Sequence, residues 1–253
     1  MSGHSKWATI RRAKGANDAK RGKIFTKLGH EIAIAAREAG PDPNSNFRLR
    51  LVLDKAKAAN MPKDNIERAI ARGAGTSKDG NDLQESLYEG YGPHGTALMV
   101  MTLSDNRNRT VSEVRRALTR FGGNLGADGC VAWMFTRKGT ISIDAGDEDP
   151  DEIALVAIDA GALDLDVEEH GVTVYAEPSD FKAVEEALRE ASYNVVEAQL
   201  AWVPNSTMQL GEKESIQTLK LVEELEELDD VQEVYTNMDI SDEVMDKYQS
   251  EAA

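Results

Sequence analysis

The sequence predicts an α+β fold, in which a helical N-terminal domain is followed by two α/β domains, one inserted in the other. Through the first 80 residues, apolar positions recur at helical spacing without an alternating pattern, whereas the rest of the chain mixes short strands with helices. The order β-α-β-β-α-β, the ferredoxin-like arrangement, then occurs twice. A chain of 253 residues has room for two or three such compact domains.

The first 80 residues are predicted to form a basic helical domain. A short cationic helix is expected over residues 7–14 and a longer one over residues 20–39. One apolar stripe at i, i+4 spacing runs along the longer helix and consists of Ile24, Leu28, Ile32 and Ala36. Gly40 and Pro41 end this helix, because proline cannot continue it.

Two further helices complete the predicted N-terminal domain. One is expected from about residue 45 to residue 60. The next begins at Pro62, which suits the first position of a helix, and turns Ile66 and Ile70 inward. This helix ends near Gly73, and the polar linker TSKDGND follows it. We therefore expect the first domain to span residues 1–80.

Two ferredoxin-like domains are expected after this linker. The outer domain, residues 81–136 with 204–240, is predicted to have strands at 84–90, 95–104, 129–135, 206–210 and 231–236 and helices at 109–121 and 212–228. The inserted domain, residues 137–203, is predicted to have strands at 139–144, 163–168, 171–176 and 195–202 and helices at 150–160 and 178–191. Right-handed crossovers would place both helices of a domain on one face of its sheet. We expect the short, polar segment 241–253 to be frayed.

The formal net charge of −16 combines two parts of opposite sign. Residues 1–80 contain 17 Lys and Arg against 8 Asp and Glu, a net charge of +9. The remaining 173 residues contain 12 against 37, a net charge of −25. This division indicates a basic contact surface joined to an acidic body that faces solvent or other partners.

Basic residues concentrate near the start of the chain. The predicted nucleic-acid-binding residues are Lys6, Trp7, Arg11, Arg12, Lys14, Lys20, Arg21, Lys23 and Lys27. Three of these lysines, at positions 20, 23 and 27, form a cationic ridge beside the apolar stripe. Clustered cations bind phosphates independently of sequence, because each neutralised phosphate releases counterions. Trp7 has two possible roles, stacking on a base or anchoring the short helix. For the whole set of residues, the alternative is a solvated cationic face that binds no ligand.

A second candidate lies in the segment SDNRNRT, residues 104–110, where a predicted strand ends before a helix. Arg107 and Arg109, together with backbone N–H groups at the start of that helix, could form an anion site. The alternative is a structural role, in which a polar side chain of this segment caps the helix. The candidate caps are Asp105, Asn108 and Thr110.

Signs of catalysis, metal binding and membrane insertion are weak. The glycine clusters EGYGPHG and FGGNLG fit turns and match no phosphate-binding loop, and the four histidines lie in unrelated segments. The lone Cys130 excludes an internal disulfide and fits a buried packing role in a reducing compartment. No apolar run is long enough to span a bilayer, and the N-terminus lacks a secretory signal. We expect a cytoplasmic protein that is not an enzyme and that needs no metal or cofactor.

Several long motifs resemble one known family nearly from end to end. They are GHSKWATIRRAKGANDAKRGKIFTKL, NMPKDNIERAIARGAG, YEGYGP, LSDNRNRT and FGGNLGADGCVAWMF. In these motifs the chain resembles bacterial members of the YebC/PmpR family. It departs from the family pattern at Phe47, His94 and Cys130, where Pro, Gly and Ser are common, and the change at His94 bears on the geometry of a turn.

The resemblance implies a helical domain followed by two α/β domains, the third inserted within the second. It also implies a cytoplasmic regulator of transcription that binds DNA. Relatives in the wider family, among them a mitochondrial translational activator of cytochrome c oxidase, instead imply a translation factor that binds ribosomal or messenger RNA. An adaptor that binds other proteins through its acidic domains, without nucleic acid, is a further alternative.

Overall fold

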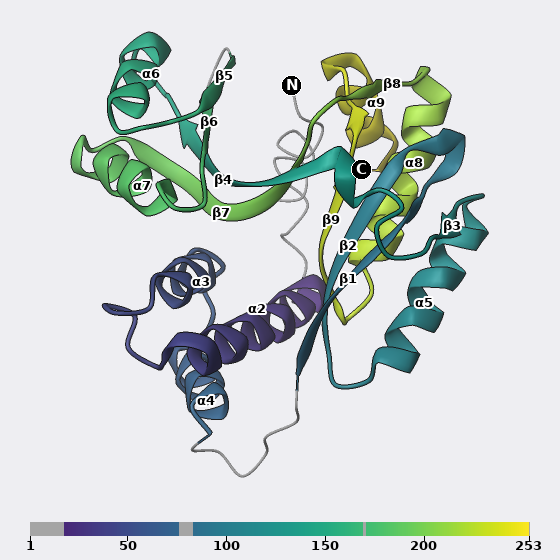
Figure 1. Cartoon of the computed structure of the whole chain (residues 1–253), viewed down its shortest axis with the longest axis horizontal. Helices are drawn as coiled ribbons and strands as arrows, with labels where there is room; N and C mark the ends of the chain where they lie inside the picture. The colour runs from purple at the N-terminus through teal and green to yellow at the C-terminus, as the bar shows by residue number, and fades with distance from the viewer. Residues whose placement is uncertain (1–17, 76–82, 169–170, 253) are drawn as a thin grey trace. The chain divides into compact units, whose positions relative to one another are not determined.

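The computed structural model describes residues 18–75, 83–168 and 171–252, which form an α+β fold (Figure 1). The predicted fold class is therefore confirmed. The described chain divides into two compact units, one formed by residues 135–205 and the other by the residues before and after this segment. Within the described ranges, no helix is both long and apolar enough to cross a membrane.

Three helices form the N-terminal part of the larger unit: α2 (Asp18–Ala39), α3 (Phe47–Ala58) and α4 (Lys63–Gly73). The predicted apolar stripe of α2 is confirmed, because Leu28, Ile32 and Ala36 are buried against α3 and α4. Gly73 has a specific packing role. A Cβ atom there would lie 2.1 Å from the carbonyl oxygen of Ala33, so only glycine permits this approach of α4 to α2.

The remaining elements of the larger unit form an antiparallel sheet in the order β3-β1-β2-β9, with helices packed against it. Its elements are β1 (Gln84–Tyr91), η1 (Pro93–Gly95), β2 (Ala97–Ser104), α5 (Arg107–Arg120), β3 (Asn124–Leu125), η2 (Ala132–Met134), β8 (Met208–Gln209), α8 (Glu212–Glu226), β9 (Val231–Thr236), β10 (Met238–Asp239) and α9 (Asp242–Ala252). Buried apolar residues of β2, α5, α8 and β9 share one core. His94, in the turn between β1 and β2, has a φ of +62°, a conformation that favours glycine.

The strand predicted at 206–210 is present but shorter than expected. β8 has only two residues and pairs in parallel with β10, outside the larger sheet. The place beside β2 belongs to β1, which pairs with β2 over eight residues. A short turn joins β1 to β2, so little loop-closure entropy opposes this hairpin.

The strand predicted at 129–135 was wrong. Residues 132–134 form the 3-10 helix η2, and the strand that follows the glycine turn is the short β3. The carboxylate of Glu89 accepts hydrogen bonds from the backbone N–H groups of Gly129, Val131 and Ala132, at 2.6, 2.9 and 2.7 Å. These donors are therefore not available to a strand ladder.

The C-terminal segment is a helix and not the expected frayed tail. Val244, Met245 and Tyr248 of α9 are buried in the core that α8 shares with the sheet. The Tyr248 hydroxyl donates a hydrogen bond to the Glu223 carboxylate of α8 at 2.5 Å. Burial and this carboxylate raise the pKa of Tyr248, so the phenol stays protonated. Three buried side chains at helical spacing thus outweigh the polar composition of this segment.

The smaller unit has the predicted ferredoxin-like order. It consists of β4 (Phe135–Asp144), α6 (Pro150–Asp159), β5 (Asp164–Glu168), β6 (Gly171–Ala176), α7 (Phe181–Glu190) and β7 (Asn194–Pro204). Its strands form one antiparallel sheet in the order β5-β6-β4-β7. Phe135 pairs with Pro204, so the segment enters and leaves the unit at neighbouring positions, as an insertion requires.

Candidate nucleic-acid interface

Part of the predicted basic set lies outside the described residues. This part comprises Lys6, Trp7, Arg11, Arg12 and Lys14. Lys20 lies in the first turn of α2, and Arg21 follows it with an exposed side chain. The Arg21 guanidinium lies 5.8 Å from the centre of the Phe25 ring, which is a cation–π distance.

Lys23 and Lys27 lie on α2 and contact the C-terminal end of α8. Lys23 Nζ is 2.8 Å from the Glu227 carboxylate and 3.0 Å from the Glu227 carbonyl oxygen. Lys27 Nζ donates to the carbonyl oxygen of Glu226. The hydrogen bond to Glu227 raises the pKa of Lys23. Because carbonyl groups at a helix C-terminus carry partial negative charge, these two lysines hold α2 against α8 within the chain itself.

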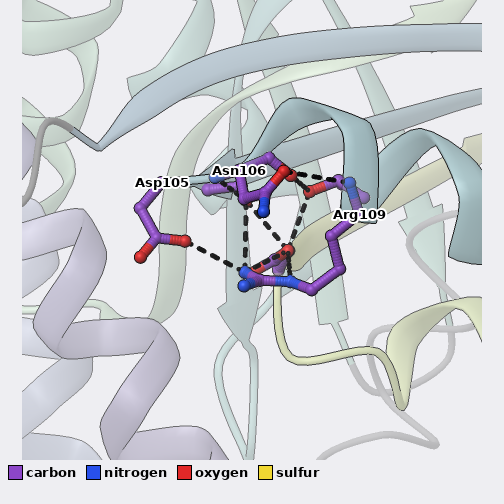
Figure 2. A network of polar contacts seen from close by, with 6 residues as sticks. Asp105, Asn106 and Arg109 are labelled. Carbon is purple, nitrogen blue, oxygen red and sulfur yellow. Dashed lines mark hydrogen bonds and ion pairs between the residues drawn. The ribbon is translucent and has the colours of Figure 1, made fainter.

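The segment of the predicted anion site, with Asp105, Asn106 and Arg109, forms a network of polar contacts (Figure 2). The Asn106 side chain caps α5, because its oxygen accepts from the Arg109 backbone N–H at 3.1 Å. The Asp230 carboxylate accepts hydrogen bonds from the Ser104 hydroxyl at 2.9 Å and the Thr110 hydroxyl at 2.7 Å. The Arg109 guanidinium donates to both oxygens of Asp230, each at 2.9 Å.

The Asp230 side chain is only 7% exposed, and its pKa reflects two opposing effects. Burial alone would raise this pKa. Hydrogen bonds from Thr110, Arg109 and Ser104, with the charge of Arg109, outweigh burial and hold the pKa below its ordinary value. Asp230 is therefore ionised at neutral pH, and Arg109 compensates its charge.

This network changes the interpretation of the Arg107 and Arg109 pair. Arg109 also bonds to the Asp105 carboxylate at 3.1 Å, so an added anion would compete with two carboxylates for one guanidinium. Arg107 is exposed in the first turn of α5. An anion site here stays a prediction that depends mainly on Arg107. The residue that caps α5 is Asn106, which was not among the three expected caps.

A cavity of about 450 Å³ adjoins this network. It is lined by His30, Arg72, Leu83, Asp105, Arg109, Glu113, Asp229 and Asp230. Four carboxylates against two guanidiniums make the cavity acidic overall, which disfavours a phosphate ligand. Across the described parts of the chain, no group of three or more His, Cys, Asp or Glu side chains is arranged to hold a metal ion.

His30 lies between this acidic cavity and a second hollow on α2. Its Nδ1 atom is buried and has no hydrogen-bond partner among the residues that the structure describes. Burial, followed by the charge of Arg72, lowers the pKa of His30, so the ring is neutral at pH 7. A neutral imidazole here adds no positive charge to either hollow.

The second hollow is a groove of about 390 Å³ between α2 and α4. It is lined by Gly22, Phe25, Thr26, Gly29, His30, Met61, Asn65, Arg68, Ala69 and Arg72. Sequence reasoning did not identify Arg68 and Arg72 as candidate site residues. A signal was present in NIERAIARG, because arginines four residues apart lie on one side of a helix.

Comparisons with known proteins match nearly the whole chain. Residues 5–76 match a family model described as the TACO1/YebC protein N-terminal domain, and residues 83–238 match one described as the TACO1/YebC second and third domain. A protein of Herpetosiphon aurantiacus named "Probable transcriptional regulatory protein" is 51% identical over 249 residues, 98% of each chain. A relative of that name from Trichlorobacter lovleyi is 50% identical over 98% of this chain and 99% of its own.

A solved structure has the same fold. It is the crystal structure of a conserved hypothetical protein from Aquifex aeolicus, with 46% sequence identity and a TM-score of 0.82. The match covers 88% of this chain and 92% of that chain. At this identity, the similarity extends to the sequence as well as to the arrangement of helices and strands.

Proposed function

This chain belongs to the TACO1/YebC family, and from that premise we propose that it binds nucleic acid and regulates gene expression without catalysing a reaction. The names of its relatives favour a DNA-binding regulator of transcription as the first candidate. The observation that carries the proposal is the separation of charge, +9 in residues 1–80 against −25 in the rest of the chain. Polyanions bind to surfaces of clustered positive charge.

The proposed contacts are made by the basic residues at the start of the chain. They are Lys6, Trp7, Arg11, Arg12, Lys14, Lys20, Arg21, Lys23 and Lys27. Lys23 and Lys27 would have to leave Glu227 and Glu226 before they reach a phosphate. The loss of these contacts would offset part of the binding free energy that these two lysines contribute.

A translation factor is the second candidate, and the acidic body of the protein favours it. On a naked duplex, a body with a net charge of −25 is repelled wherever it comes within a Debye length of the phosphates, about 8 to 10 Å. On a ribosome, the same basic helices would contact ribosomal or messenger RNA, and the acidic α/β domains would face basic proteins. Either function would be carried out in the cytoplasm, where a lone cysteine such as Cys130 stays reduced.

Crosslinking in growing cells tests the proposal and separates the candidates. The full-length chain carries an affinity tag, and the DNA and the RNA that crosslink to it are both sequenced. Enrichment at promoters supports the transcriptional candidate, and enrichment of ribosomal RNA overturns it in favour of translation. A variant with Lys6, Arg11, Arg12 and Lys14 changed to Gln is the matched control. If neither nucleic acid crosslinks to the unmodified protein above background, the protein is an adaptor and the proposal is wrong.

A further inference from the structure

We propose that the groove between α2 and α4 binds the sugar-phosphate backbone of a nucleic acid, with Arg68 and Arg72 as its phosphate ligands. The inference rests on the proposed function and adds a defined site to it. The positions of the side chains follow from the helix. Asn65, Arg68, Ala69 and Arg72 stand at i, i+3, i+4 and i+7 of α4, and all four line the groove.

Several guanidiniums of this acidic chain contact carboxylates, among them those of Arg48, Arg109 and Arg120. Arg68 instead donates to the backbone carbonyl of Asp64 and to the side-chain oxygen of Asn65. Across the described residues, neither Arg68 nor Arg72 has a carboxylate within ion-pair distance.

Two guanidiniums four residues apart suit the phosphates of a polynucleotide. A guanidinium presents a planar set of donors that matches phosphate oxygens, and it stays charged at every physiological pH. The exposed side chain of Arg68 and the half-buried side chain of Arg72, which also lines the acidic cavity, place two positive charges on the lining of the groove. A chain of phosphates can meet both positions, whereas a single carboxylate meets only one.

Two glycines of α2, Gly22 and Gly29, line the groove. A Cβ atom on Gly22 would meet nothing within 4 Å, and one on Gly29 would meet only the Met61 Cε atom, at 3.9 Å. Packing among the described residues therefore requires neither glycine. Glycine inside a helix costs about 0.5–1 kcal/mol relative to alanine. What the exposed Gly22 does provide is a bare stretch of helix backbone, which a ligand can approach closely.

The groove also contains an aromatic side chain, that of Phe25, among its lining residues. The half-buried Phe25 lines it between the two glycines, and the Arg21 guanidinium lies beside its ring. An aromatic ring next to phosphate ligands is the pattern by which proteins hold an unpaired strand, because every base can stack on a ring. The volume of about 390 Å³ lies within the range of ligand sites, roughly 300–1,000 Å³.

The test measures the affinity of the intact protein for two probes. One is a fluorescein-labelled single-stranded RNA, and the other is a DNA duplex of the same length. Fluorescence anisotropy is followed as a function of salt concentration, and urea unfolding of each variant reports its stability. The groove variants are Arg68→Gln with Arg72→Gln, and separately Gly22→Leu. The matched control is Lys57→Gln with Lys63→Gln, which removes the same charge from two exposed lysines paired with Asp54 and Glu67.

The double arginine variant is expected to bind about tenfold more weakly than the control. Its log–log salt slope should fall by about 1.4–1.8, since each lost phosphate contact accounts for about 0.7–0.9. Gly22→Leu should weaken binding several-fold while its resistance to urea is unchanged or higher, because leucine favours a helix. That combination separates a binding role from a structural one. The probe that loses more affinity shows whether the groove holds an unpaired strand or a duplex.

Two outcomes would overturn the inference, and they differ in what else they reject. If the unmodified protein binds a probe and both groove variants bind it like the control, the groove is not the site, but the proposed function survives. If the unmodified protein binds neither probe even in dilute salt, the proposed function fails, and the groove proposal fails with it.

Discussion

One carboxylate, that of Asp230, joins segments that lie far apart in the sequence. It precedes β9 and binds Ser104 at the end of β2 and Thr110 in the first turns of α5. We expect Asp230→Asn to lower the free energy of unfolding by about 1–3 kcal/mol, because an amide cannot accept all these hydrogen bonds. Urea unfolding measures the change. Asp229→Asn, at the exposed neighbouring position, is the control, and equal midpoints for the two variants would contradict this account.

The contribution of Asp230 to the stability of the folded protein should depend on pH. Because the pKa of Asp230 is lowered in the folded protein, its contribution to stability is complete above the unfolded pKa of about 3.9. The contribution is lost as the pH falls through the folded pKa. The difference in urea midpoint between the unmodified protein and Asp230→Asn should thus be constant near neutrality and shrink below about pH 4. A difference that grows on acidification would show that the sign is wrong.

Glu89 holds the loop that contains Gly129, Val131 and Ala132. Its carboxylate accepts from three backbone N–H groups, which together outweigh burial and lower its pKa. In Glu89→Gln, one carboxylate oxygen becomes an amide donor that faces these donors. We expect faster hydrogen exchange at the amides of Gly129, Val131 and Ala132. Glu190→Gln, on an exposed side chain, serves as the control, and unchanged protection in Glu89→Gln would refute the assignment.

At the scale of elements, α9 makes the C-terminal segment part of the fold. Met245 is buried against α8, and truncating such a residue removes apolar contacts and leaves a cavity. Met245→Ala should therefore lower the free energy of unfolding by about 2 kcal/mol or more. The exposed change Ser250→Ala should have little effect. Equal stability of the two variants in urea would mean that the segment is frayed after all.

The sequence predicts elements well where one periodicity continues over many residues. The stripe of α2 and the order of the smaller unit follow from local patterns, and the structure confirms them. The prediction for residues 129–135 failed, and the strand expected at 206–210 is shorter, because non-local contacts decide those segments. Glu89 lies far in sequence from the loop that it binds, and β8 pairs with β10 over only two residues.

The candidate site was predictable only in part, for a related reason. Counting charges identifies the basic N-terminal region, but it does not show which cations already have partners within the chain. Lys23 and Arg109 have carboxylate partners more than 100 residues away in sequence, whereas Arg68 and Arg72 have none among the described residues. A groove also depends on how two helices pack, which composition does not report.

At the scale of the whole molecule, the division into domains 1–80, 81–136 with 204–240, and 137–203 stays a prediction. The compact unit 135–205 gives a direct way to test its inserted part. Expressed alone, this segment should fold, because its first and last strands pair along their length and it forms a compact unit of its own. Dispersed amide signals in NMR and a cooperative thermal transition would support this. A disordered spectrum would contradict it.

The central claim is that the cationic start of an otherwise acidic chain holds the nucleic acid. The most direct test is the salt dependence of binding for the intact protein and for a variant with Lys6, Arg11, Arg12 and Lys14 changed to Gln. The account predicts tight binding by the unmodified protein and, in the variant, weaker binding with a log–log slope reduced by up to about 2.8–3.6 for four lost contacts. Equal affinity and equal slope for the two proteins would contradict it.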